Sequence, residues 1–378
     1  MKTLRVEGWR GINHSYAIVN QWQLLELCRL PVELCHVDRP FFNAGWNPGR
    51  NGSGLGDAQQ RQIASIRGPR PGEHADIAYR ITFPFDLSAC DADRLFVFGT
   101  AEYQHTTGMF AGGDLQQSIA DERLSIVTPS HWSAAGFLKT GFDPARVHVV
   151  AHGIDPGTFR PIDRKRRKTM RNLMRVRNDD FVLLSVGAMT ENKGIDLLLT
   201  AFARLRRRHR HLKLVLKDQS NLYGLTADRI LATLGTSAQG NPFTEDVVAS
   251  IIFVSHNLSV ADLAALYGSV DCYVSPYKAE GFNLTPLEAA GCGVPVVVTR
   301  GGSTDDYFEP AIGLQVDSKR VQSGHRTWLE PDPESLHDAL ARIIEGRQRF
   351  DAAAVSAAVH ARFTWSKVTG DLGRVLGL

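Results

Sequence analysis

The sequence contains few cysteines and no long apolar run. Its five cysteines are scattered and form no CxxC pair: Cys28, Cys35, Cys90, Cys272 and Cys292. This pattern argues against a zinc cluster or a disulfide framework and favours a reducing compartment. No apolar run reaches the roughly 20 residues that span a bilayer, and residues 1–7 lack the apolar core of a signal peptide. We therefore expect a cytoplasmic protein.

The net charge is also small. At +3 it does not indicate nucleic-acid binding, and metal-site spacings such as HExxH are absent. Asp91-Ala92-Asp93 imitates a metal-binding DxD motif, but it precedes a predicted strand, and we interpret it as a solvated turn. Gly52 to Gly56 resembles a dinucleotide fingerprint, but no apolar strand precedes it. We expect neither a nucleic-acid partner nor a bound metal or other cofactor.

The chain has room for two α/β domains, because it has 378 residues, of which 43% are apolar and 22% charged. Short apolar runs alternate with helical periodicity in two successive series. The predicted strands are 4–7, 32–37, 77–81, 95–98, 124–128, 147–150, 181–186, 212–216, 251–254, 270–274 and 296–299. The pattern predicts two doubly wound, Rossmann-like domains with a cleft between them, 1–162 and 163–362. The stretch 39–72 is rich in Gly, Asn, Pro and Arg and reads as a long loop beside that cleft.

The stretch Ser275–Pro295 is the most informative part of the sequence. It reads as strand, polar turn, helix and strand, with Thr285 as helix cap and Pro286 at the first helical position. A helix that starts at the carboxyl end of a parallel strand offers backbone N–H groups and a positive dipole end to an anion such as phosphate.

Two glutamates lie in this stretch. Glu288 has a structural alternative, because Thr285-x-x-Glu288 is a capping box in which Glu288 only accepts the backbone N–H of Thr285. Glu280 has no structural duty visible in the sequence. Two carboxylates beside a phosphate site suit the hydroxyls of a sugar or a ribose.

The run from Glu280 to Glu288 resembles the Glu-x7-Glu motif of retaining GT-B glycosyltransferases of family 4. The resemblance implies the GT-B fold and a nucleotide-diphosphate sugar as donor. It implies that Glu280 contacts the donor sugar and Glu288 the ribose, while the residues between them hold the diphosphate and sugar: Gly281, Phe282, Asn283, Leu284 and Thr285. It also implies that a last helix, 363–378, returns to the first domain.

The turn after strand 181–186 extends the resemblance. Gly187 to Gly194 is similar to the family's Gly-Arg-x4-Lys-Gly turn, and Lys193 matches the lysine that holds the donor diphosphate. Ala188 stands where the partner arginine is expected. Lys217 or Lys278 would then supply the missing positive charge.

The acceptor side is predicted from the first domain. Gly8, Arg10, Gly11 and His14 follow the first strand and resemble the family's Gly-rich, acceptor-facing loop. The structural alternative is a tight turn that needs small residues, although such a turn needs neither Arg10 nor His14. A family histidine usually follows the strand at 95–98. Here Glu102 is the nearest match in register and a candidate catalytic residue with Glu280 and Lys193, and His105 lies three residues on.

Two basic runs, 164–168 and 206–211, have two interpretations. They are solvated linker and helix-end residues, or they contact an anionic membrane, which would make the protein peripheral to the inner membrane.

The resemblance implies a metal-independent, retaining transfer from GDP-mannose or a UDP-hexose to a glycan, glycolipid or polyprenyl-linked acceptor, in bacterial polysaccharide assembly. Two alternatives remain open. Ala188 and the absent histidine favour a non-catalytic protein that binds sugar nucleotides. A nicotinamide-dependent oxidoreductase would need GxGxxG directly after a strand, which the sequence lacks.

Overall fold

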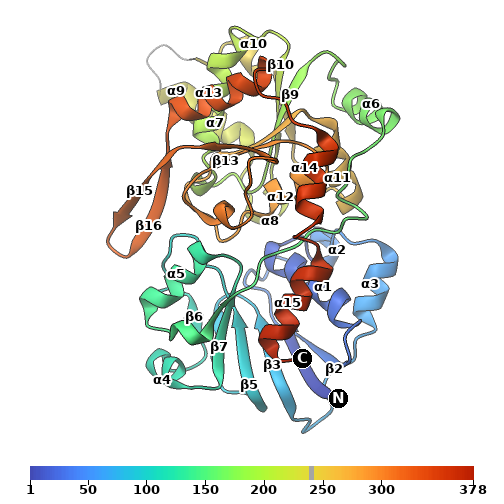
Figure 1. Ribbon diagram of the computed structural model, residues 1–378, viewed down its shortest axis with the longest axis vertical. Coiled ribbons are helices and arrows are strands. Elements are labelled where there is room, and N and C mark those ends of the chain that lie inside the picture. The colour runs from blue at the N-terminus through green and yellow to red at the C-terminus, as the bar shows by residue number, and fades with distance from the viewer. Residues whose placement is uncertain (238–241) are drawn as a thin grey trace. The chain divides into compact units, whose positions relative to one another are not determined.

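The computed structural model describes residues 1–237 and 242–378, which form two compact units. The first comprises Met1–Gly153, Gly324–Arg326 and Phe363–Leu378, and the second comprises Ile154–Ser323 and Thr327–Arg362. Each unit has a six-stranded parallel sheet (Figure 1). Among the described helices, none combines the length and apolar composition that a bilayer crossing requires.

The first unit is built on a sheet with the order β2-β1-β3-β5-β7-β8. Its strands are β1 Lys2–Gly8, β2 Val32–Asp38, β3 Ala75–Ile81, β5 Ala92–Phe98, β7 Leu124–Thr128 and β8 Val147–Val149, with a separate small pair, β4 Phe85–Asp86 and β6 Phe110–Ala111. Its helices are α1 Ser15–Leu27, α2 Pro48–Asn51, α3 Asp57–Ala64, α4 Leu115–Ala120, α5 His131–Thr140 and α15 Trp365–Leu376. The direction of strand order changes between β1 and β3, so ligands are expected at the carboxyl ends of these two strands.

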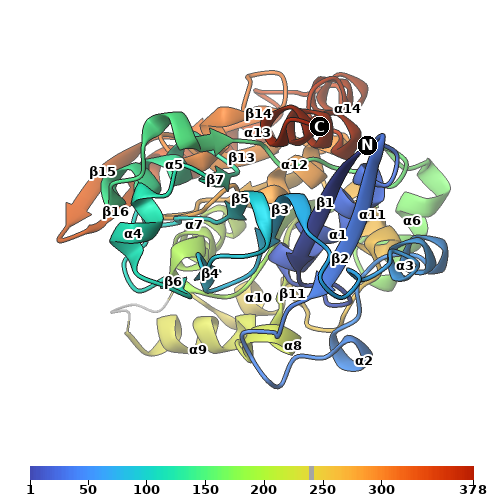
Figure 2. The same cartoon turned by 90° about the horizontal axis from the view of Figure 1, so that it is seen from below.

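The C-terminal helix α15 packs on α1 within the first unit. Trp365 of α15 stacks on Trp22 of α1 with ring centroids 6.3 Å apart, and both side chains are buried. The two chain ends therefore lie near each other in this unit (Figure 2), where Lys2 Nζ donates to the carbonyl of Gly377.

The second unit has a sheet with the order β11-β10-β9-β12-β13-β14. Its strands are β9 Phe181–Val186, β10 Leu212–Lys217, β11 Ile251–Val254, β12 Cys272–Ser275, β13 Val296–Thr299 and β14 Gly313–Val316, with the hairpin β15 Ser318–Ser323 and β16 Arg326–Pro331. Its helices are α6 Arg164–Leu173, α7 Ile195–Arg206, α8 Ser220–Tyr223, α9 Ala227–Ser237, α10 Glu245–Val248, α11 Val260–Ser269, α12 Leu284–Gly291, α13 Pro333–Ile344 and α14 Ala352–His360. In sequence order the sheet is 3-2-1-4-5-6, the Rossmann order, with its switch point between β9 and β12.

The core of this unit follows from the apolar periodicity of its helices. Leu198, Leu199 and Phe202 of α7 pack with Leu214 of β10 and Leu340 of α13, and all five side chains are 0% exposed. Burial of such side chains stabilises the fold by roughly 1.5–3 kcal/mol each. This packing holds α7 and α13 against the sheet whose edge carries the candidate site.

One prediction for this unit is wrong. Arg164 to Lys168 is not a linker but the first half of α6, which Asp163 caps by accepting the N–H of Arg166 at 2.7 Å. The hairpin of β15 and β16 (Figure 1) was not predicted, since β15 is polar and largely exposed and carries no apolar run.

Helix α6 is anchored by its own arginines. Arg167 donates to Asp271 Oδ1 at 2.6 Å, and Arg171, which is 2% exposed, donates to Asp271 Oδ2 at 3.3 Å. Arg164, Lys165 and the other outward-facing cations of the run remain exposed. Part of the basic run is therefore structural.

Candidate functional site

The candidate donor site lies in the second unit, at the carboxyl ends of β9 and β12. Gly187 follows β9 and the loop 276–283 follows β12. These two strands are neighbours in the sheet although β10 and β11 lie between them in sequence. The predicted residues of the two motifs are thus brought to one sheet edge, where open α/β sheets bind ligands.

The turn Thr190–Gly194 is fastened to the loop after β12. The carbonyl of Asn192 accepts the N–H of Lys278 at 2.7 Å, and Asn192 Nδ2 donates to the carbonyl of Ala279 at 3.0 Å. Gly194 has a φ of 65°, and a Cβ there would lie 2.0 Å from the carbonyl oxygen of Pro276. Only glycine permits this approach, because the clash is with backbone.

This fastening brings Lys193 and Glu280 together. Lys193 Nζ contacts Glu280 Oε1, and the Glu280 side chain is 6% exposed while that of Lys193 is 23% exposed. An ammonium group has three N–H donors, so Lys193 can contact a carboxylate and a phosphate oxygen together. The pair combines a hydroxyl acceptor with a cation at the sheet edge.

The helix after this loop starts in an unexpected way. Helix α12 begins at Leu284, and its N-cap residue Asn283 has a left-handed backbone with φ 64° and makes no side-chain cap. The prediction of Thr285 as cap is wrong, because Thr285 Oγ1 instead accepts the hydroxyl of Tyr273 at 2.7 Å. Pro286 accordingly lies at the third helical position rather than the first. The first turn, at Leu284 and Thr285, therefore keeps its backbone N–H groups for an anion.

Asn283 is held from both sides. Its Nδ2 donates to Ser275 Oγ at 2.9 Å, and its carbonyl accepts the hydroxyl of Tyr307 at 2.7 Å. Phe282 packs against the ring of Tyr307 with centroids 5.1 Å apart. The segment from Gly281 to Leu284 is therefore positioned by the buried Tyr307, which the motif alone does not show.

Glu288 does not form the capping box. Its Oε2 accepts the hydroxyl of Tyr267, from α11, at 2.9 Å. Burial raises the pKa of Glu288 to about 8, and the Tyr267 hydrogen bond opposes this only in part. With this pKa the carboxyl is largely protonated at pH 7. Glu288 is therefore a buried, titratable group and not part of a capping box.

The other predicted cations are engaged elsewhere. Lys217 ends β10, is buried, and donates to the carbonyl of Asp218; burial lowers the pKa of its ammonium group. Lys278 Nζ lies 3.5 Å from Asp196 Oδ2. Ala188 is buried where an arginine was expected. Lys193 is thus the lysine that the structure pairs with Glu280.

In the first unit, Arg10 and His14 have structural roles that the sequence did not reveal. Arg10 donates to both carboxylate oxygens of Asp38 at 2.7 and 2.8 Å and to the carbonyl of Ile63 at 2.9 Å. His14 caps α1, because its Nδ1 accepts the N–H of Tyr16 at 3.2 Å, and burial lowers the pKa of its imidazole to about 4. The imidazole is therefore neutral at pH 7.

The remaining predicted residues of the first unit lie at or after the carboxyl ends of β1 and β5. Gly8 ends β1, and a Cβ there would lie 2.5 Å from Ile81 Cγ2 of β3. Gly11 has a φ of 84°. Glu102 and His105 lie in the loop after β5, where the carbonyl of Glu102 accepts the indole N–H of Trp132 at 2.7 Å. This loop and the start of α1 are joined by Tyr16 and Thr100, whose hydroxyl oxygens lie 3.0 Å apart.

The chain is similar in sequence to known glycosyltransferases. Residues 180–346 match the family described as "Glycosyl transferases group 1". A D-inositol 3-phosphate glycosyltransferase from Segniliparus rotundus is 28% identical over 238 residues, which are 61% of this chain and 46% of the relative. An MMP alpha-(1→4)-mannosyltransferase from Mycolicibacterium hassiacum is 32% identical over 199 residues, 52% of this chain and 42% of the relative. The chain thus spans about half the length of the curated relatives it matches.

A solved structure covers the whole chain. Anabaena HepE in complex with UDP and glucose aligns over 100% of this chain and 99% of that chain, with a TM-score of 0.62 and 16% identity. The chain has the GT-B fold. The fold predicted from the sequence is confirmed. The Lys193–Glu280 pair lies in the C-terminal of the two Rossmann-like domains.

The raised pKa of Glu288 predicts a pH-dependent stability. Between an ordinary carboxyl pKa and about 8 the folded state keeps a proton that the unfolded state loses, so stability falls as pH rises through this range. The slope is at most about 1.4 kcal/mol per pH unit. Glu288→Gln removes the titration and keeps an acceptor for Tyr267. The stability of the variant relative to the parent should therefore increase from pH 5 to pH 8, as measured by the melting temperature at each pH. Melting temperatures that change with pH in the same way for both proteins would contradict the raised pKa of Glu288.

Proposed function

We propose that the protein is a retaining glycosyltransferase that uses a nucleotide-diphosphate sugar. The observation that carries the proposal is the contact of Lys193 with Glu280 beside the uncapped start of α12. The family match of residues 180–346 and the GT-B fold support it. The proposed donor is GDP-mannose or a UDP-hexose, and the proposed acceptor is a glycan, glycolipid or polyprenyl-linked sugar in bacterial polysaccharide assembly.

In this proposal the diphosphate lies between Lys193 and the amides of Leu284 and Thr285. The bond from the anomeric carbon to the diphosphate breaks, and the new bond to the acceptor oxygen forms on the same face of the sugar. The acceptor proton passes to the departing phosphate oxygen, so no protein nucleophile is required. The positive groups stabilise the charge that develops on the leaving group. Glu280 orients the sugar through its hydroxyls, and Glu288 binds the ribose.

The acceptor side and the membrane contact belong to the same proposal. The loops that carry Gly8, Gly11, Glu102 and His105 meet at the carboxyl edge of the first sheet, which suits an acceptor. The exposed cations of α6 suit an anionic bilayer surface, and co-sedimentation with anionic and neutral vesicles measures that contact.

One alternative function has an observation in its favour. Ala188 stands where the family has an arginine, so one of the two cations expected at the diphosphate is absent. This absence favours a protein that binds sugar nucleotides without catalysing transfer. An assay of transfer and donor hydrolysis with a panel of UDP-, GDP- and ADP-sugars decides between the two functions. Thermal-shift measurements with the same panel identify the donor, since a ligand at about 100 times its Kd adds about 2.7 kcal/mol of stability.

The two glutamates should respond differently to substitution. If the ribose binds ionised Glu288, nucleotide diphosphate affinity should rise about fivefold from pH 7 to pH 8, because a group with a pKa of about 8 is ionised to about one tenth at pH 7 and to about one half at pH 8. Glu288→Gln should abolish this dependence and weaken nucleotide binding by tenfold or more, since a charged hydrogen bond contributes about 1.5–3 kcal/mol. Glu280→Gln should keep nucleotide affinity and lose turnover. Calorimetry on both variants measures this, and intact nucleotide affinity in Glu288→Gln would reject the ribose assignment.

Lys193→Ala should lower transfer by roughly 10²-fold or more, because it removes a positive group that stabilises the leaving diphosphate. Lys217→Met is the matched control, since its buried ammonium group contacts a backbone carbonyl rather than Glu280. Steady-state rates at saturating donor measure both. A near-parental rate in Lys193→Ala would place the phosphate clamp elsewhere.

Transfer should survive EDTA, because the proposed phosphate contacts are a lysine and backbone amides. Within residues 1–237 and 242–378, no three His, Cys, Asp or Glu side chains are grouped as metal ligands. The assay compares rates with EDTA, with EDTA plus Mg²⁺ and with EDTA plus Mn²⁺. Loss of activity that Mn²⁺ or Mg²⁺ restores would refute this part of the proposal.

A further inference from the structure

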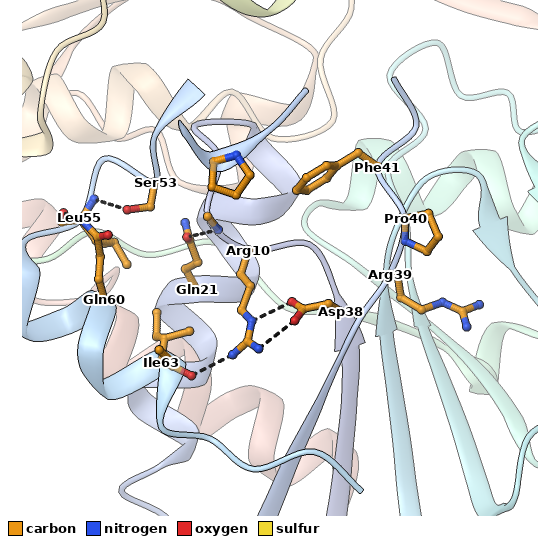
Figure 3. A pocket seen from close by; sticks show the side chains of 13 residues that line it. Arg10, Gln21, Asp38, Arg39, Pro40, Phe41, Ser53, Leu55, Gln60 and Ile63 are labelled. Atoms are coloured by element: carbon orange, nitrogen blue, oxygen red, sulfur yellow. Dashed lines mark hydrogen bonds and ion pairs between the residues drawn. The ribbon is translucent and has the colours of Figure 1, made fainter. Parts of the chain in front are cut away.

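We propose that a cavity in the first unit binds an uncharged, apolar aglycone of the acceptor. The cavity has a volume of about 630 Å³ and lies among the loop after β1, the loop after β2 and the insertion that holds α2 and α3 (Figure 3). The inference rests on the proposed transferase function, and it narrows the acceptor from any glycan to one that carries an alkyl or aryl group.

The walls of the cavity are largely apolar. Pro40 and Phe41 contribute from the loop after β2, and Pro48, Leu55 and Ile63 contribute from the insertion. A sugar ring would need several polar partners to replace its hydrogen bonds to water, whereas an alkyl or aryl group gains from removal of its surface from water. A volume of this size is within the ordinary range for small-ligand pockets.

The charged groups at the cavity are already paired. Arg10 holds Asp38 through two hydrogen bonds, as Figure 3 shows, and Arg39 contacts Asp86. The polar groups of the insertion are also bonded, since Gln60 donates to the carbonyl of Leu55 at 2.6 Å. These pairs neutralise the charges at the cavity, which favours an uncharged ligand over a charged one.

Gln21 offers a hydrogen-bond donor to a ligand in the cavity. Its side chain comes from α1, lines the cavity and is 2% exposed. Its Oε1 accepts the N–H of Gly11 at 2.8 Å, which fixes the orientation of the amide, and its Nε2 is buried with no hydrogen-bond partner. A buried donor without a partner is costly, so the ligand should present an oxygen, such as a glycosidic oxygen, to Nε2.

The cavity lies where an acceptor is needed. Arg10 and Gly11 follow β1, and Asp38 ends β2, so the cavity adjoins the carboxyl edge of the first sheet. An apolar group seated against Phe41 and Leu55, with its glycosidic oxygen on Gln21, therefore leaves its sugar at the ligand-binding edge.

The test compares methyl and n-octyl glycosides of one sugar, below the micelle concentration of the octyl compound. Saturation-transfer NMR gives binding without donor, and acceptor KM gives binding during transfer. Ala64→Trp obstructs the cavity from α3, and Ala58→Trp places the same side chain on an exposed position of that helix which does not line the cavity. The parent and Ala58→Trp should bind the octyl glycoside at least about tenfold more tightly than the methyl glycoside, and Ala64→Trp should erase this preference.

The outcomes separate this inference from the proposed function. Equal binding of the two glycosides by the parent, or an unchanged octyl preference in Ala64→Trp, overturns the cavity assignment. Octyl binding that Ala64→Trp abolishes, without transfer to any acceptor, supports the cavity and rejects the transferase. Transfer with equal KM for both glycosides supports the proposed transferase function and rejects the cavity as the aglycone site. Gln21→Met keeps the side-chain volume and should weaken octyl binding about tenfold, and unchanged binding would reject the contact with Nε2.

Discussion

The proposed donor site depends on one close backbone approach. Gly194 passes so near the carbonyl of Pro276 that no side chain fits between them, and Asn192 bonds to the same loop. These contacts join two segments that lie more than 80 residues apart in the sequence, since Asn192 and Ala279 are separated by 87 positions. Without this junction Lys193 and Glu280 would lie on independent loops, and their contact would cost the entropy of ordering both.

Buried hydroxyl groups hold the rest of the site. Tyr273 bonds Thr285, Tyr307 bonds the carbonyl of Asn283, and Tyr267 bonds Glu288. Each tyrosine combines a large apolar ring in the core with one polar atom that reaches the site. The site residues are thus positioned from within the apolar core, and the start of α12 is left uncapped for a ligand.

The sequence predicted the strands well because parallel strands that are covered on both faces are short apolar runs. Strands 124–128, 181–186, 251–254 and 296–299 have the predicted bounds. The capping box at Thr285 failed because Asn283 turns left-handed one position before the helix, and local capping patterns cannot show which tertiary partner a side chain prefers. Helix α6 was missed because Asp271, about a hundred residues further on, neutralises its arginines.

The cavity beside Gln21 had no signal in the sequence. Its lining residues come from four separate segments, and the unpaired N–H of the Gln21 amide can be recognised only once the fold buries it. Helix α1 buries Asn20 and Gln23 as well as Gln21, so its polar residues do not single out Gln21 in the sequence.

The packing of α15 on α1 has a consequence for synthesis of the chain. The ribosome makes α15 only after the whole of residues 154–362, so Trp22 and its neighbours on α1 have no cover while the second unit emerges. The unit that begins first is therefore completed last, and an apolar face on the nascent chain must stay out of contact with other chains during that interval.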